Sequence, residues 1–176
     1  MKKYISIALL ALLTLSISSC TKDADVVAIE SKLPSLQLSS LGYQQASPFT
    51  IPTTVLQLNF GATSTGISTG AFKIEILNGT AATSPVIKTV NFPSWTGKDD
   101  SVIITPGNVL NGPHSISYTL QNTTYPSTNV YAGSILLKLS ALGLTAGGTY
   151  SVRATALSAD GTKTSVITQL SFFKTI

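Results

Sequence analysis

The feature that most constrains this chain is a two-residue alternation of apolar and polar side chains, which begins at Leu36 and continues almost to its end. Residues two apart lie on one face of a strand, whereas a helix repeats its face every 3.6 residues. Phe72, Ile74 and Ile76, for example, alternate with polar residues. The pattern therefore predicts strands that each bury one face and expose the other.

About nine such segments follow one another, and short clusters of Gly, Pro, Asn, Ser and Thr separate them. Their buried-face or bounding residues are Leu36 and Leu38; Leu56, Leu58 and Phe60; Phe72, Ile74 and Ile76; Val86 to Phe92; Val102 to Thr105; Ile116, Tyr118 and Leu120; Ile135, Leu137 and Leu139; Tyr150, Val152, Ala154 and Ala156; Val166, Thr168, Leu170 and Phe172. No helical segment is present to connect parallel strands. We expect an all-β chain whose residues 34–176 fold as an antiparallel β-sandwich. The long interval between the Phe72 and Ile135 strands, with turn signals at 105–108 and 111–113, predicts an inserted hairpin.

The N-terminus has the composition of an export signal. Lys2 and Lys3 precede an apolar stretch over residues 5–17, and small residues follow up to Cys20, the only cysteine. Thirteen residues of helix reach about 20 Å, which is short of a hydrocarbon core of about 30 Å. We interpret residues 1–19 as a cleaved signal peptide.

The four residues Ile17, Ser18, Ser19 and Cys20 resemble the lipobox of bacterial lipoproteins. That resemblance implies a diacylglycerol thioether on Cys20, cleavage before it and acylation of the new amino group. Two or more acyl chains anchor a protein stably, whereas one binds only marginally. The alternative is an ordinary signal that leaves a free or disulfide-bonded cysteine.

Residues 20–33 are expected to be the lipidated N-terminus and a solvated tether. Lys22, Asp23, Ala24 and Asp25 resemble the export signals of Bacteroidota surface lipoproteins, although Ala24 interrupts the acidic run. The resemblance implies an outer-membrane protein exposed at the cell surface. A solvated linker facing the periplasm is the alternative.

Residues 144–154, LTAGGTYSVRA, resemble the region between strands E and F of fibronectin type III domains. The resemblance implies an Ig-like or fibronectin III-like sandwich in which Tyr150 forms a structural corner with its hydroxyl bonded to upstream backbone, and Leu144 lies six residues before it. Ala146 replaces the usual proline, and the tryptophan common in strand B is absent.

The sequence contains one pattern that formally matches a catalytic motif, that of the α/β-hydrolases. Gly66, Ser68 and Gly70 make a G-x-S-x-G sequence, and Asp99 or Asp100 and then His114 follow in the order of α/β-hydrolases. A nucleophile elbow needs a helix after the serine, whereas a strand is expected there. His114 is better explained as a side chain at the entrance of a strand. We therefore expect no enzyme and name no catalytic residue.

The sequence offers few residues for a metal site, a glycosidase pair or a nucleic-acid-binding surface. With one His and no cysteine inside the domain, no metal site or cofactor is expected. The four acids of the domain are placed in turns or beside lysine, so a glycosidase pair is not expected. The net charge falls from +4 to +2 without Lys2 and Lys3, and the remaining basic residues are scattered, which argues against nucleic-acid binding.

Three aromatic residues are candidates for binding. Trp95 lies in a loop after Phe92, and Tyr125 and Tyr131 flank a polar stretch. Exposed aromatic rings beside amides and hydroxyls suit sugar rings or protein partners. The alternative is that Trp95 plugs the end of the sandwich. Ser101, within Asp100-Ser101-Val102, resembles the acceptor of Bacteroidota O-glycosylation.

These features together predict a lipid-anchored outer-membrane protein that acts as a non-catalytic binding module for a glycan or an envelope-protein partner. The alternative function is a structural accessory subunit of an outer-membrane assembly or adhesin, which engages partners through sheet edges. A hydrolase is the third possibility.

Overall fold

The computed structural model describes residues 21–98, 114–169 and 172–176. The chain divides into two compact units, Met1–Leu33 and Pro34–Ile176. Cys20 and Ser101 lie outside the described residues, as do Asp99 and Asp100. The expected strand from Val102 to Thr105 and the turn signals of the inserted hairpin, at 105–108 and 111–113, also lie outside the described residues, so expectations that rest on any of these residues remain expectations.

The described part of the first unit contains helix α2 (Thr21–Glu30), so most of the segment expected to be a solvated tether is helical. The segment contains no Gly or Pro, and Asp23 and Asp25 lie in its first half, where the helix dipole favours acidic side chains. Ser31 N–H extends the helical pattern by donating to the Val27 carbonyl at 3.0 Å. Among the residues that the structure describes, no helix is both long and apolar enough to cross a membrane.

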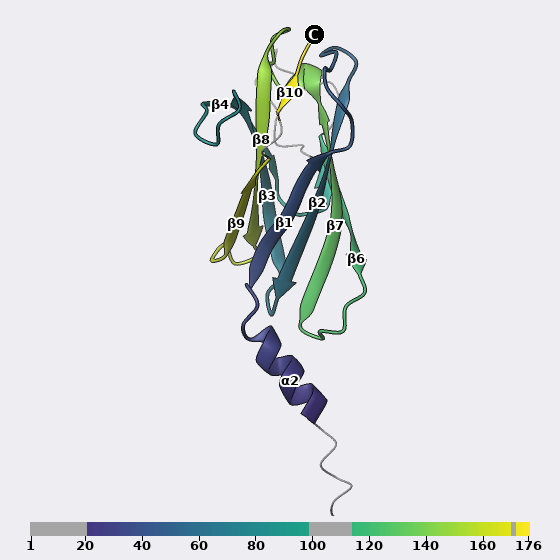
Figure 1. The fold of residues 1–176 in the computed structure, drawn as a ribbon, viewed down its shortest axis with the longest axis vertical. Coiled ribbons are helices and arrows are strands. Elements are labelled where there is room, and N and C mark those ends of the chain that lie inside the picture. Colours follow the sequence, from purple (N-terminus) through teal and green to yellow (C-terminus); the bar gives the residue numbers. More distant parts are fainter. Residues whose placement is uncertain (1–20, 99–113, 170–171) are drawn as a thin grey trace, which may run out of the picture. The chain divides into compact units, whose positions relative to one another are not determined.

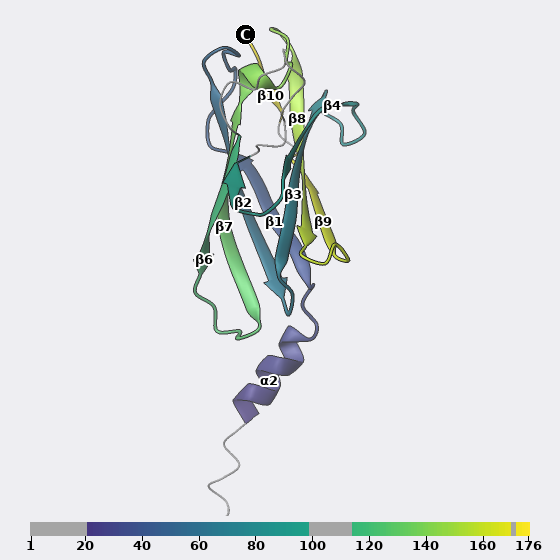
Figure 2. The same cartoon turned by 180° about the vertical axis from the view of Figure 1, so that it is seen from behind.

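The second unit is the antiparallel β-sandwich that the alternation predicts (Figures 1 and 2). One sheet has the strand order β1-β2-β7-β6-β5 and the other β10-β8-β3-β4, with β9 also paired to β8. The strands are β1 (Leu36–Tyr43), β2 (Val55–Thr65), β3 (Thr69–Asn78), β4 (Val86–Phe92), β5 (Gly97–Lys98), β6 (Ser115–Gln121), β7 (Thr128–Lys138), β8 (Thr149–Ser158), β9 (Thr164–Thr168) and β10 (Phe173–Lys174). A short 3-10 helix, Leu139–Ala141, follows β7.

The core lies between the two sheets and is built from the apolar members of the alternating pairs. Leu56, Leu58 and Phe60 of β2 face Phe72 and Ile74 of β3, and all five are buried. Their polar neighbours along each strand are more exposed, as the burial patterns of β2 and β3 show. The sandwich expected from the sequence is thus confirmed.

The last strand departs from the expected pattern. We expected one strand with Val166, Thr168 and Phe172 on its buried face, but the structure has two short strands, β9 and β10. Val166 and Phe172 are exposed, and Phe173 is buried instead. The pairing of β8 explains this change, because β9 pairs with its residues 153–157 and β10 with its residues 149–150.

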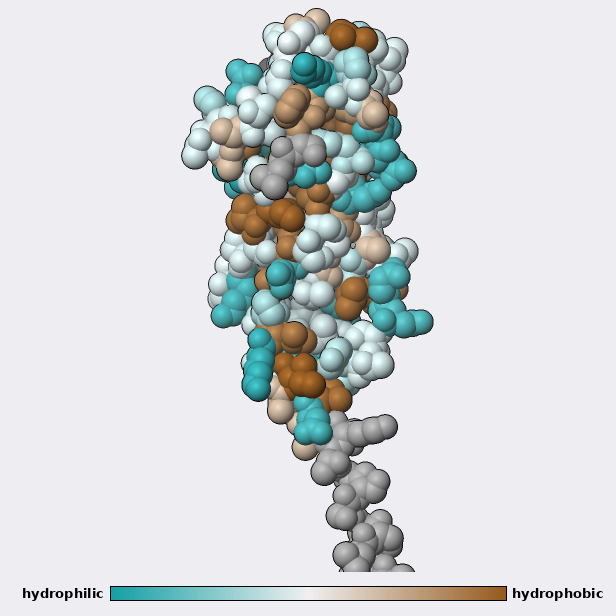
Figure 3. Space-filling view, in the orientation of Figure 1, coloured by the Kyte–Doolittle hydropathy of each residue, from teal (hydrophilic) through white to brown (hydrophobic). Residues whose placement is uncertain are grey.

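The two sheets are joined differently along their two sides. On one side β1 contacts β9, where the Leu38 N–H donates to Ser165 Oγ at 2.8 Å. On the other side the chain crosses from the end of β4 in one sheet to β5 in the other, and Trp95 lies in this crossing. The face of the protein seen in Figure 3 carries separate apolar groups divided by hydrophilic residues.

Candidate functional site

Trp95 belongs to the core, and this corrects its place among the candidate binding residues. Its side chain is 1% exposed, and its ring lies 5.5 Å from that of Phe72, 6.0 Å from that of Phe60 and 5.1 Å from that of Tyr131, between centroids. The crossing from β4 to β5 brings the ring between the two sheets, where it fills space that a smaller side chain would leave empty. Trp95 therefore plugs the side of the sandwich.

Tyr131 is also a packing residue. It is 5% exposed, its hydroxyl shares a hydrogen bond of 3.0 Å with Ser64 Oγ, and its ring contacts that of Tyr118 edge-on at 4.9 Å. Tyr125 is half-buried in the loop between β6 and β7, where it has no ring contact with described residues. The structure therefore does not assemble Trp95, Tyr125 and Tyr131 into one exposed surface.

Ser68 and His114, two residues of the formal hydrolase pattern, have different structural surroundings. Ser68 is exposed in the turn between β2 and β3, and strand β3 follows it where an elbow would need a helix. His114 is buried before β6, and its Nδ1 accepts the Lys138 N–H at 3.1 Å. Within the described ranges, no three His, Cys, Asp or Glu residues gather as metal ligands.

Tyr150 makes the corner contact that the fibronectin resemblance implies. The Thr145 N–H donates to the Tyr150 hydroxyl oxygen at 2.9 Å, and Thr145 Oγ1 lies 3.0 Å from the same oxygen. Leu144, one residue upstream of Thr145, packs against the core. A Cβ at Gly148 would overlap the Tyr150 ring, so the glycine lets the ring lie over the backbone.

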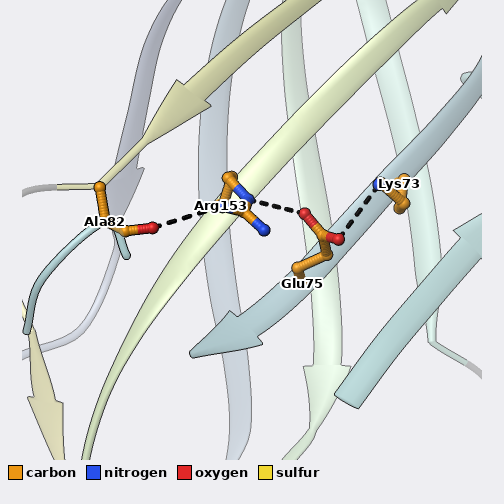
Figure 4. A network of polar contacts seen from close by, with 4 residues as sticks. All are labelled: Lys73, Glu75, Ala82 and Arg153. Carbon is orange, nitrogen blue, oxygen red and sulfur yellow. Dashed lines mark hydrogen bonds and ion pairs between the residues drawn. The ribbon is translucent and has the colours of Figure 1, made fainter. Parts of the chain in front are cut away.

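A charged network lies on the outer face of the β3-β8 sheet (Figure 4). Arg153 Nε donates to Glu75 Oε2 at 2.7 Å, Lys73 Nζ lies 3.1 Å from Glu75 Oε1, and an Arg153 amino group donates to the Ala82 carbonyl at 3.3 Å. The Arg153 hydrogen bond is the main cause that lowers the pKa of Glu75, and Lys73 adds to it. The network ties two strands and the β3-β4 loop together, and we assign it a structural role.

The β8-β9 hairpin holds the second perturbed carboxylate. Asp160 accepts hydrogen bonds from Ser158 Oγ at 2.5 Å and from Thr162 N–H at 3.0 Å, and these lower the pKa of Asp160 to about 2. Gly161 beside it has a φ of 71°, which favours glycine. Asp160 thus lies in a turn, which is one of the two kinds of place expected for the acids of the domain.

The most distinctive exposed feature of the sandwich is one part of strand β6, residues 117–121, which we call the β6 edge. Strand β5 pairs only with Ser115 and Ile116, so no described strand covers the outer side of the β6 edge (Figure 1). Its five residues, Ser117, Tyr118, Thr119, Leu120 and Gln121, carry no charge. Leu120 lies opposite Tyr131 in register and is 58% exposed.

The exposure of Leu120 differs from expectation, because its place in the alternation assigns it to a buried face. It does lie on the same face as Ile116 and Tyr118, but its side chain is left largely uncovered. Tyr118 is half-buried beside it and joins the aromatic cluster through Tyr131. Sequence periodicity identifies the face of a strand and cannot reveal where the facing sheet ends.

A shallow open depression of about 550 Å³ lies beside the β6 edge. Asn59, Ser117 and Ser134, from the adjacent strands β2, β6 and β7, form one row of its lining and occupy successive positions of the register. All three are uncharged and polar. The β6 edge is thus continuous with this depression, because Ser117, Tyr118 and Thr119 belong to both.

Comparison with known proteins adds little to this description. No family model and no curated protein matches the chain. Among solved structures, Astrotactin-2, described as a conserved vertebrate-specific and perforin-like membrane protein involved in neuronal development, is similar with a TM-score of 0.38 and 13% sequence identity. The match covers 77% of this chain and 22% of that protein, so this chain spans about a fifth of its length.

Proposed function

We propose that this chain is a lipid-anchored, non-catalytic binding module of the cell envelope, and that it binds a protein partner along the β6 edge. The observation that carries this proposal is an uncharged strand edge without a described neighbour, beside a Leu120 side chain that is 58% exposed. Such an edge offers backbone donors and acceptors for an added strand, and its side chains provide specificity.

A protein partner fits the structure better than a glycan. The glycan hypothesis rested on exposed aromatic rings, and the two candidate rings that meet, Trp95 and Tyr131, are both buried. Tyr125 is left as a single half-buried ring. The β6 edge presents Tyr118 and Leu120 beside unpaired backbone groups, which is a combination that proteins recognise.

The N-terminal sequence supports the lipid anchor. Residues 1–19 have the composition of an export signal, and Cys20 lies at the position that the lipobox pattern requires. Acylation there would place the sandwich outside the cytoplasm at the outer membrane. The sequence around Lys22, Asp23 and Asp25 favours the cell surface.

The strand order supports an Ig-like sandwich of the kind used by binding modules. If β1, β2, β7 and β6 are equated with strands A, B, E and D, and β3, β8 and β9 with C, F and G, these seven strands have the order of an Ig constant-type domain, and β4 is an additional strand beside β3. The Tyr150 corner fits the same assignment. The fold by itself does not establish the function, and the proposed function rests on the β6 edge.

The same edge also favours our second candidate, a structural accessory subunit of an outer-membrane assembly or adhesin. The two functions differ in the lifetime of the complex. A binding module exchanges its partner, whereas an accessory subunit remains bound through purification.

Two measurements on the full chain in its own cells test the proposal. Labelled fatty acid should appear on the parent and be absent from Cys20→Ala, which should also leave the membrane fraction. A photoreactive amino acid placed at Leu120 should form a covalent adduct with a protein, whereas the same group at Val166, which is 56% exposed on β9, should not. An unlabelled, soluble parent, or equal adducts at both positions, would contradict the proposal.

A further inference from the structure

The β6 edge differs from the other sheet edges in how it is protected. Natural proteins protect an open edge with charges, prolines, bulges or covering segments, because unpaired backbone groups otherwise template association. Strand β4, the outer strand of the opposite sheet, lies between Pro85 and Pro93, and its Lys88 lies opposite the buried Ile76. Its pairing with β3 also contains a register shift.

Strand β1 is protected in other ways. Its pairing with β2 shifts register between Leu38 and Ser40, and Ser165 of β9 accepts the Leu38 N–H. Among the described residues the β6 edge shows none of these devices: no described strand covers it, its residues include no proline or charged residue, and its pairing with β7 runs without a shift. The contrast favours pairing of the β6 edge with a further strand.

The sequence of the β6 edge is complementary to itself. The uncovered segment begins after Ile116, where β5 ends its pairing, and it ends at Gln121, so its midpoint is Thr119. When two copies pair antiparallel about that midpoint, Thr119 faces Thr119, Ser117 faces Gln121, and Tyr118 faces Leu120. Residues that face each other across a pair share one face of the sheet. The apolar residues therefore meet on the core side and the polar residues meet on the outer side.

We propose that the partner of the β6 edge is a second copy of this chain, joined by antiparallel pairing of residues 117–121 about a two-fold axis at Thr119. The pairing makes one continuous sheet from the two β1-β2-β7-β6 sheets. It also brings the Leu120 side chain, which is 58% exposed, against Tyr118 of the other copy. The contact is isologous, so it closes at two copies.

The interface is small, and its strength rests on the anchoring in the proposed function. Five residues from each chain bury less area than a stable soluble dimer needs. Confinement to one membrane raises the effective concentration of the copies and favours such a contact. Because no charge lies in residues 117–121, the pairing should depend little on ionic strength.

Site-specific cross-linking of the full chain in intact cells tests this pairing. A thiol cross-linker should convert Thr119→Cys to a covalent dimer, because the two introduced thiols face each other. Asn91→Cys is the matched control, since Asn91 is also exposed and lies on β4, the protected outer strand of the other sheet. We expect dimer from Thr119→Cys and only background from Asn91→Cys and from the parent.

A second variant tests the side-chain contacts. Adding Leu120→Lys to Thr119→Cys should lower the cross-linked yield by roughly tenfold, because both Tyr118–Leu120 contacts are lost. Leu120 is too exposed for this change to unfold the sandwich, which the urea midpoint of the variant verifies. Equal cross-linking of Thr119→Cys and Asn91→Cys in labelled, membrane-bound chain would overturn the pairing. Capture of a different protein by Thr119→Cys would do so as well.

The anchoring and the pairing can fail separately. An unlabelled, soluble parent overturns the anchoring alone. The pairing is then measured by the same cross-linking on the purified full chain at high concentration, with Cys20→Ala added to remove the other thiol. A dimer that forms under those conditions supports the pairing, and its absence overturns it.

Discussion

At the scale of single residues, Trp95 fills the side of the sandwich and contacts Phe60, Phe72 and Tyr131 while exposing 1% of its surface. Its Nε1 proton is buried without an acceptor among the described residues. The contribution of Trp95 therefore comes from its volume and its ring contacts.

Trp95→Ala should lower the free energy of unfolding by about 3–5 kcal/mol, because it leaves a large cavity between the sheets. Urea denaturation followed by circular dichroism measures the change. Tyr125→Ala is the matched control, since Tyr125 is half-buried in a loop and should lose less than about 1 kcal/mol. An unchanged urea midpoint for Trp95→Ala would show that the ring does not pack as described.

The sequence contains the signals for several residue roles and leaves others open. The roles of Tyr150 and Leu144 can be predicted because a tyrosine corner has a local sequence pattern. The hydrogen bond between the Tyr150 hydroxyl and Thr145 joins residues only five positions apart. Trp95 cannot be assigned in the same way. Its burial depends on Phe60, Phe72 and Tyr131, which come from β2, β3 and β7 and meet only in the folded sandwich.

At the scale of elements, Glu75 of β3 holds Arg153 of β8 and Lys73 on its own strand. Its side chain is 12% exposed, so both ion pairs are partly shielded from solvent. Because the folded pKa of Glu75 is lowered, its ionised form stabilises the fold at neutral pH. That contribution is lost as the pH falls below the ordinary glutamate pKa of 4.5 and through the lowered folded value.

Glu75→Gln should therefore lower stability at pH 7 by about 1 kcal/mol, and the difference from the parent should shrink under strongly acidic conditions. Urea midpoints measured from pH 7 down to pH 3 give both values. Lys88→Gln serves as the control, since Lys88 forms no ion pair with described residues. A difference between Glu75→Gln and the parent that stays constant with pH would contradict the assigned role of the carboxylate.

The sequence predicts most of the strands, but it does not predict which strand sides stay unpaired at the edge of a sheet. Alternation identifies β2, β3 and β7, because each has a buried and a wetter face over most of its length, whereas β4 alternates only near its end. The division between β9 and β10 depends on where each pairs with β8, which the local pattern does not contain. The open edge of β6 is likewise a property of the assembled sheet.

At the scale of the whole molecule, the end of the chain closes the sandwich. Phe173 is fully buried and its ring contacts those of Tyr43, Phe49 and Tyr150. Thr175 Oγ1 donates to the Thr145 carbonyl at 2.6 Å. Residues more than a hundred positions apart are thus held together by the last strand, β10.

Removal of residues 172–176 should cost more than the roughly 3–5 kcal/mol expected for one buried phenylalanine, which is a large part of a domain's usual 5–15 kcal/mol. We expect the shortened chain to lose its cooperative thermal transition and to be cleaved rapidly by protease. Ile176→Ser is the control, because this side chain is 61% exposed and its loss should be almost neutral. A shortened chain with the thermal stability of the parent would show that β10 is dispensable.

The sequence by itself determined the class of fold, because this depends on short-range patterns. The proposed location at the outer membrane rests on a short-range pattern as well. A two-residue alternation indicates that each strand buries one face, and the proposed export signal and lipobox rest on the pattern of residues 1–20 alone. Tertiary structure alone decided that Trp95 is interior and that Leu120 is exposed. Burial depends on which strands come to face each other, and that is settled by contacts between segments far apart along the chain.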